Sequence, residues 1–323
     1  MEHDLSISIQ GFNNADKARE LGNITLEVIR HLELKYLLDV SKLKKVIVSF
    51  DFPAALQSIT KEFNHQAPPT FTNSEQAKAV AQLVSRISHD GQISEYALVL
   101  SVDFFIELFD DAGLISLDNI SQIIHRMHHE LVHVHELNRN SLDNSMLIDD
   151  YDNAFLMTSK RAWSEYLANY MSSNTATDDS IRNMLFTLER ILIEVPLEID
   201  DLVLKYKHGF LSLSEMHSAV TERIKLIANM YGYAYGYIHG MDIDVETHFP
   251  DLFELLSKSP LSISLSALGE ALSSIKCKFD DRGISDYDVF NSSIRAIRAI
   301  YASFGLQVSR SAEPGMGLYI NVY

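Results

Sequence analysis

The stretch Tyr96-Ala-Leu-Val-Leu-Ser-Val102 decides how the first part of this chain is interpreted. Its apolar, partly β-branched composition is typical of a buried strand. After a predicted turn at Asp110–Leu117, apolar residues recur at helical spacing from about Asn119 to Leu137, with Asp118 as the expected N-cap. A strand followed by a long helix indicates a unit that mixes α and β structure.

Working outward toward the N-terminus, alternation and short β-branched runs predict strands at Leu5–Gln10 and Lys45–Phe50. Capping residues and helical spacing predict three helices. The first begins after Asn14, the second begins at Ala54, and the third spans Asn73–Ile87. Loops are expected at Pro68-Pro69 and at His89-Asp90-Gly91.

Toward the C-terminus, the polar, acidic stretch Asn138–Asn153 predicts a solvated loop. Five helices are expected after it, at Ala154–Ser172, Ser180–Val195, Leu211–Tyr237, Pro250–Ser257 and Asp286–Phe304. A closing β pair, Leu306–Ser309 with Gly317–Val322, is expected around Pro314-Gly315. The predicted fold is α+β: a small twisted sheet with helices in residues 1–145, then a mainly helical part in 146–323.

Composition narrows the class of protein. The 323 residues are 46% hydrophobic, which is enough to form a core, and the net charge of -17 disfavours nucleic acid as a partner. One cysteine, Cys277, excludes an internal disulfide and fits a reducing compartment. The longest apolar-aromatic stretch, Leu226–Ile238, has 13 residues, fewer than the ~20 that span a bilayer. With no signal peptide in the first residues, we expect a cytoplasmic protein without a membrane segment.

The residues that point to chemistry are His129-Glu130-Leu131-Val132-His133 on the helix predicted after the best strand. Residues i and i+4 share one helix face, so two imidazoles at this spacing reach one zinc ion. Glu130 is then placed to act as a general base on a zinc-activated water. The structural alternative is a solvated helix in a histidine-rich region.

A hydrolytic zinc site needs a third protein ligand. The extension HExxHxxGxxH is excluded, because Glu136 and Arg139 stand at its Gly and last His positions. Glu165 lies on the next predicted helix among apolar neighbours, where an unpaired carboxylate is costly. We therefore predict Glu165 as the third ligand; the alternative is a salt-bridged or surface glutamate. Asn169, one turn further on, is either a partner that steadies the motif helix or an exposed amide.

HExxH followed by a helix reading Trp163-Ser-Glu165-Tyr166-Leu-Ala168 resembles the gluzincin branch of the zincin metallopeptidases. The resemblance covers about residues 96–172 and is one of motifs. It implies His129, His133 and Glu165 as zinc ligands and Glu130 as base. It also implies that the strand Tyr96–Val102 forms the edge of the cleft and pairs with an extended peptide substrate.

In gluzincins, a hydrogen-bond donor well downstream of the zinc ligands in the sequence often stabilises the oxyanion that forms during the reaction. The candidates here are four ring-bearing residues, His217, Tyr231, Tyr233 and His239. The run Tyr231–Tyr237 is interpreted as a buried helix whose small residues allow close packing, with an aromatic binding wall as the alternative. Among the remaining histidines, His125 is expected in the cleft or in solvent, and His128 and His135 at the surface.

The sequence thus favours a cytoplasmic, zinc-dependent hydrolase, a gluzincin-like metallopeptidase acting on a peptide or protein. The alternative is a zincin-like metal-binding domain with a regulatory or interaction role and no peptidase activity. Glu130 distinguishes the two, since a scaffold does not need the base. A third interpretation is an all-helical interaction protein with a chance HExxH. The oligomeric state is left open.

Overall fold

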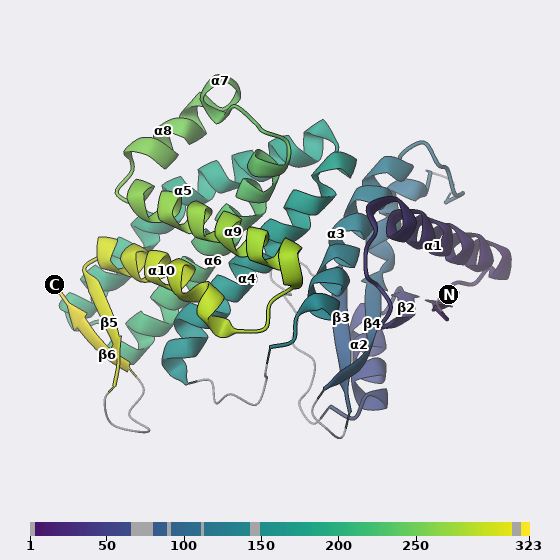
Figure 1. The fold of residues 1–323 in the computed structure, drawn as a ribbon, viewed down its shortest axis with the longest axis horizontal. Helices are drawn as coiled ribbons and strands as arrows, with labels where there is room; N and C mark the ends of the chain where they lie inside the picture. The colour runs from purple at the N-terminus through teal and green to yellow at the C-terminus, as the bar shows by residue number, and fades with distance from the viewer. Residues whose placement is uncertain (1–3, 66–79, 89–91, 111–112, 143–148, 312–317) are drawn as a thin grey trace. The chain divides into compact units, whose positions relative to one another are not determined.

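The structure is a computed structural model that describes residues 4–65, 80–88, 92–110, 113–142, 149–311 and 318–323. The chain divides into two compact units. One comprises Met1–Arg139 with Thr175–Thr177, and the other Asn140–Asn174 with Asp178–Tyr323. The division predicted at residues 145 and 146 falls in the stretch 143–148, outside the described residues. The predicted α+β class is confirmed, and each unit contributes its own sheet (Figure 1).

The first unit is built on a four-stranded sheet in the order β1-β2-β4-β3. Its strands are β1 (Ser6–Gln10), β2 (Leu43–Ser49), β3 (Ala81–Ile87) and β4 (Ile93–Ser101). The first three in spatial order run parallel, and β3 pairs antiparallel with β4. The unit's helices are α1 (Ala15–Tyr36), α2 (Phe52–Glu62), the 3-10 helix η1 (Val102–Leu108) and α3 (Ile120–Arg139).

Local signals explain most of these boundaries. Asn14 caps α1 by accepting hydrogen bonds from the backbone N–H groups of Asp16 and Lys17, as its position in the sequence predicts. Asp51 caps α2, where Pro53 lies in the first turn and needs no hydrogen-bond donor. The two upstream strands lie where the alternation and the β-branched run predict them.

The best-predicted strand is confirmed, but the implied pairing of this strand with an extended peptide substrate is wrong, because both of its edges are already paired. Every residue of β4 from Tyr96 to Ser101 is buried, and β4 pairs with β2 on one side and β3 on the other. A continuous apolar run is typical of a strand covered on both faces, which is a central position. The strand beside β4 at the edge is β3.

The helix predicted over Asn73–Ile87 is also wrong for its described part, because Ala81–Ile87 forms β3. Residues 66–79 and the turn His89–Gly91 lie outside the described residues. Ala81 and Gln82 favour helices locally, but hydrogen-bonded pairing with the backbone of β4 overrides that preference. Strand pairing is a tertiary contact, so the local pattern does not contain it.

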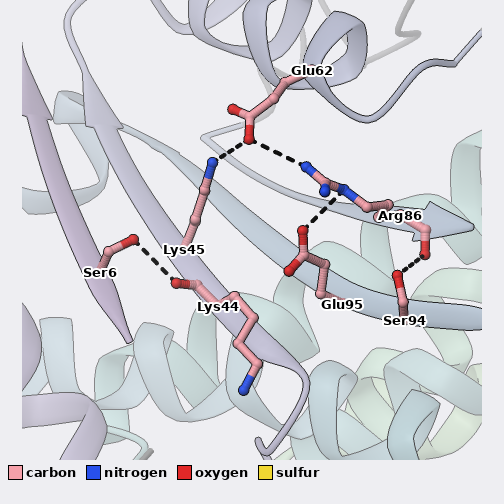
Figure 2. A network of polar contacts seen from close by, with 7 residues as sticks. All are labelled: Ser6, Lys44, Lys45, Glu62, Arg86, Ser94 and Glu95. Carbon is pink, nitrogen blue, oxygen red and sulfur yellow. Dashed lines mark hydrogen bonds and ion pairs between the residues drawn. The ribbon is translucent and has the colours of Figure 1, made fainter. Parts of the chain in front are cut away.

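Charged side chains join β3 to its neighbours (Figure 2). Glu62 of α2 pairs with Lys45 of β2 and, at 3.3 Å, with Arg86 of β3. Arg86 also pairs with Glu95 of β4 at 2.9 Å. Each partly exposed pair contributes only about 0–1 kcal/mol, so this network aligns the strands more than it stabilises them.

A separate core lies between α2 and one face of this sheet. Ile47, Ala97 and Val99 contact α2 side chains that include Phe52 and Leu56. Because successive side chains of a strand point to opposite faces, Val46, Leu98 and their alternates point to the other face.

The second unit is mainly helical. Its helices are α4 (Asp150–Ser172), α5 (Asp178–Lys207), α6 (Leu213–Gly240), α7 (Val245–His248), α8 (Pro250–Lys258), α9 (Ser262–Arg282) and α10 (Asn291–Ser303), with the 3-10 helices η2 (Ser173–Thr175) at the division between the units and η3 (Tyr287–Phe290). The antiparallel pair β5 (Leu306–Arg310) and β6 (Leu318–Val322) closes the chain as predicted. Pro314-Gly315 lies outside the described residues.

Two differences from the predicted helices follow from local chemistry. The expected loop Asn138–Asn153 ends earlier, because Asp149 caps α4 and Asp150 and Asp152 sit favourably in its first turn. Helix α5 continues through Pro196 to Lys207, well past the predicted end. A buried face on either side of the proline holds the helix together.

Helix α6 packs against α4 with unusually close backbone contact. A Cβ atom on Gly232 would lie 2.3 Å from the carbonyl oxygen of Ala162, and one on Gly236 would lie 2.5 Å from that of Tyr166. Only glycine permits this approach. The interpretation of Tyr231–Tyr237 as a close-packed helix is therefore confirmed.

Candidate metal centre

Helix α3 carries the HExxH residues and is fixed by an apolar side. Ile123, Met127, Leu131 and Val134 are fully buried, and the helix contacts α1 and η1. His129, Glu130 and His133 lie on other positions of the helix and are half-buried. The packing therefore fixes the backbone of the motif, while its polar side chains remain partly accessible to solvent.

His129 and His133 come together as the i, i+4 spacing predicts. Their Nε2 atoms are 3.2 Å apart, and the rings are nearly perpendicular at 85°. Two nitrogens that bind one tetrahedral zinc at about 2.0–2.1 Å stand about 3.3 Å from each other. The two imidazoles thus already have the separation that a shared zinc ion requires.

Glu136 is a residue that the sequence reasoning did not assign to the site. It is almost fully buried, and its Oε2 lies 3.8 Å from Nδ1 of His133. A carboxylate beside Nδ1 favours the tautomer that leaves the Nε2 lone pair available to a metal. The i+3 spacing of a glutamate from a predicted ligand was a usable signal, because such residues are neighbours on a helix.

His128 is fully buried, so the prediction of a surface position is wrong. Its Nδ1 lies 3.0 Å from Oγ1 of Thr175, and its ring packs on Tyr36 at 4.1 Å. Burial, aided by the nearby His125 and other basic groups, lowers the pKa of His128 to about 3. The ring is therefore neutral at physiological pH and belongs to the packing of the unit. His125 is buried as well and shares the Thr175 hydroxyl.

His135 is the second histidine whose predicted surface position is wrong. Its Nδ1 accepts a hydrogen bond of 2.8 Å from the backbone N–H of Asp39. Asn138 donates to the carbonyl oxygen of Asp39 at 2.9 Å, so both side chains join the end of α3 to the segment before β2. Neither interaction is visible in the sequence, because almost 100 residues separate the partners.

Arg126, three residues before the motif, joins α3 to η1. Its guanidinium donates to both carboxylate oxygens of Glu107 and, at 2.8 Å, to the carbonyl oxygen of Phe104. Partial burial alone would raise the pKa of Glu107, but the hydrogen bonds and charge of Arg126 lower it. This two-pronged pair orients the start of the motif helix.

Glu165 lies in the second unit, on α4. The residue is 8% exposed, and Trp163 and Tyr166 beside it are fully buried. The prediction of a glutamate in an apolar setting is therefore confirmed, and the alternative of an exposed surface glutamate is wrong. The glycine contacts between α6 and α4 fix the backbone that carries it.

Asn169 is also buried, one turn after Glu165. Its amide donates to the carbonyl oxygen of Tyr233 at 2.9 Å, which adds a polar link between α4 and α6. The exposed-amide alternative is thus wrong, and a role in steadying the motif helix stays a prediction.

The four candidates for an oxyanion-stabilising donor all lie on α6 but differ in surroundings. Tyr231 is buried and stacks on Tyr235, and burial raises its pKa. His239 is exposed, and its Nδ1 lies 2.6 Å from the hydroxyl of Tyr166. His217 and Tyr233 are half-buried. Burial lowers the pKa of His217, with Asp150 opposing the shift.

Comparison with known proteins identifies no family for this chain. No family model matches the chain, and neither the curated proteins nor the solved structures give a match. Among the described residues, none of the helices has both the length and the apolar character needed to cross a bilayer.

Proposed function

We propose that the protein is a zinc-dependent hydrolase and that peptides or proteins are its substrates. His129, His133 and Glu165 would hold the zinc ion, and Glu130 would act as the general base. Two imidazoles and one carboxylate are a donor set of the kind that holds a metal ion, and three protein ligands are typical of catalytic zinc.

The observation that carries the proposal is the 3.2 Å separation of the two Nε2 atoms on α3. The burial of Glu165 supports it independently, because a buried carboxylate is costly unless a cation or several hydrogen bonds satisfy it. Glu165 belongs to the other unit. That it binds the same zinc ion as the two histidines is therefore part of the proposal.

Bound zinc would act as a Lewis acid that lowers the pKa of a water molecule toward about 7. Glu130 follows His129 directly and is half-buried, so its carboxylate can take a proton in a partly desolvated setting. Glu136 would keep His133 in the required tautomer. One of His217, Tyr231, Tyr233 and His239 would stabilise the charge that develops on the substrate oxygen.

The first experiment measures zinc per chain by elemental analysis, on protein purified without a chelator or a metal-binding tag. We expect about one zinc ion per chain in the wild type and a sharp loss in His133→Ala and Glu165→Ala. The matched controls are His31→Ala and Glu20→Ala, which remove an exposed histidine and an exposed glutamate of α1. A wild type that takes up no zinc when zinc is supplied contradicts the proposal. Zinc retained by Glu165→Ala removes Glu165 from the ligand set.

The second experiment tests catalysis on a library of peptides, with cleavage followed by mass spectrometry. Glu130→Gln should keep its zinc and lose about 10²- to 10⁴-fold in rate, the usual contribution of a general base. A zinc-loaded wild type that cleaves no peptide would favour the alternative of a metal-binding regulatory domain. Equal rates in wild type and Glu130→Gln would remove Glu130 from its catalytic role.

A further inference from the structure

A line of exposed apolar side chains runs along α5 in the second unit. Phe186, Ile193, Leu197 and Leu204 are 52%, 50%, 67% and 53% exposed. Each residue of an α-helix is rotated by about 100° about the axis from the one before it. All four side chains therefore point within about 20° of one direction around the helix, over a length of about 27 Å. The opposite side of α5 is buried within the unit by residues that include Leu188, Leu192, Val195 and Ile199. We call these four exposed residues the α5 stripe.

The α5 stripe is symmetric about position 195. Phe186 and Leu204 lie at equal distances from it along the chain, and so do Ile193 and Leu197. The symmetry extends to charge, because Arg190 and Asp200 also lie at equal distances on either side. With the same rotation of about 100° per residue, Arg190 and Asp200 each lie within about 40° of the stripe around the helix axis. An isologous contact between two copies requires a surface of this kind, in which one half complements the other.

Arg190 and Asp200 differ from the charged residues of α5 that form ion pairs within the unit. Asp201 pairs with Lys205 at 2.6 Å, and Glu198 pairs with Arg223 of α6 at 3.2 Å. Within the residues that the structure describes, Arg190 and Asp200 are both exposed and neither has an ion pair. The pair beside the stripe therefore keeps opposite charges available for another molecule.

We propose that the α5 stripe binds the α5 stripe of a second copy of this chain, with the two helices antiparallel. A two-fold axis at the height of residue 195 places Phe186 against the partner's Leu204 and Ile193 against the partner's Leu197. The same axis places Arg190 against the partner's Asp200. The interface thus alternates apolar and charge-complementary layers, as in an antiparallel coiled coil.

Charge selects the antiparallel arrangement over the parallel one. In a parallel pair, Arg190 would face the partner's Arg190, and Asp200 the partner's Asp200. Like charges in one layer disfavour that arrangement. Pro196 lies next to the centre of symmetry, so any bend it imposes falls at the same height in both copies. The proposal is independent of zinc, since it uses only the second unit's α5.

Sedimentation equilibrium over a range of protein concentrations tests the proposal on the full chain. A single helix pair is at the low end of specific interfaces, which bury about 800 Å² per partner, so we expect a reversible monomer–dimer equilibrium. Leu197→Glu should remove the dimer. Ile263→Glu, which alters an 84% exposed residue of α9, is the matched control and should leave the dimer intact. A wild type that stays monomeric to about 1 mM overturns the proposal. So does a dimer that survives Leu197→Glu.

Charge exchange tests the orientation. Arg190→Asp and Asp200→Arg should each weaken self-association by about tenfold or more, because each places like charges in two layers. The double variant, and an equimolar mixture of the two single variants, should both recover dimers. Single variants that associate as well as the wild type overturn the antiparallel pairing. Circular dichroism of each variant checks that the helices remain folded.

Discussion

Two helices of this protein are rich in rings, yet they use them differently. Helix α3 carries five histidines from His125 to His135, and α6 carries four tyrosines at alternate positions from Tyr231 to Tyr237. In α3, neighbouring elements occupy the ring nitrogens, as Thr175 does for His128 and the Asp39 backbone does for His135. In α6, rings stack, with Tyr231 and Tyr235 5.5 Å apart, while the intervening glycines admit α4.

The comparison shows that a cluster of rings does not by itself indicate a site. Most of the rings in both helices are explained by packing and by hydrogen bonds inside their own unit. His129 and His133 differ because their Nε2 atoms approach each other, an arrangement that suits a shared cation. Four changes test this contrast, in order of decreasing expected effect.

The first change tests the packing interpretation of α6. Gly232→Ala should destabilise the protein by at least about 2–3 kcal/mol, because the new Cβ meets the Ala162 carbonyl oxygen at 2.3 Å and backbone cannot move away cheaply. Gly22→Ala on α1 is the matched control, since its Cβ would make an ordinary contact of 3.5 Å with Ile9. It should be neutral or stabilising by up to about 1 kcal/mol. Urea unfolding measures both. Equal costs would show that α6 does not depend on the close approach.

The second change sharpens the interpretation of α3. Zinc at about 100 times its dissociation constant should stabilise the wild type by about 2.7 kcal/mol, because it binds the folded state selectively. The stabilisation should disappear in His133→Ala and persist in His128→Asn, when each variant is compared with its own metal-free form. Thermal unfolding with and without added zinc measures it. A response to zinc that depends on His128 and not on His133 would reverse the assignment of the rings.

The third change concerns how α3 is oriented. Arg126→Met keeps much of the side-chain volume and removes the two-pronged contact to Glu107. We expect a loss of about 1 kcal/mol, since the pair is only partly buried. The expected loss is smaller in Lys258→Met, which breaks an exposed pair with Glu254 on α8. If both variants lose the same free energy, Arg126 does not anchor the motif helix.

The smallest expected effect is a pH dependence carried by α6. Burial lowers the pKa of His217 in the folded state, so the unfolded chain binds a proton more readily. The free energy of unfolding should therefore fall as pH decreases below the ordinary histidine pKa of about 6.5. His217→Gln should show a shallower fall between about pH 7 and pH 5. Urea unfolding at several pH values checks the slope, and an unchanged slope would mean that His217 titrates alike in both states.

Local signals were sufficient where a segment's structure depends on its own residues. The Asn14 cap, the apolar run of β4 and the i, i+4 histidines were all predicted, because each acts within a few residues. Helix α9, which spans Ser262–Arg282, is not among the predicted helices, since its serines and lysines obscure the apolar spacing. Gly283, with φ of 73°, ends that helix, because glycine adopts a positive φ without strain.

Positions that depend on distant partners could not be predicted. The sequence predicts His128 and His135 at the surface, because histidine is commonly exposed and their partners Thr175 and Asp39 are remote in sequence. In the sequence, Glu136 is only a mismatch to the longer motif HExxHxxGxxH, whereas in the structure its burial beside His133 gives it a role.

The sequence by itself determined the mixed α and β class, most helices and the spacing that brings two imidazoles to one point. These features follow from periodicity, capping and the 3.6-residue turn, which are local. The tertiary structure decided that β4 is central, that β3 is a strand, and which histidines are buried. Strand order and burial depend on contacts between residues far apart in the chain, and each such contact is fixed only when the whole unit folds.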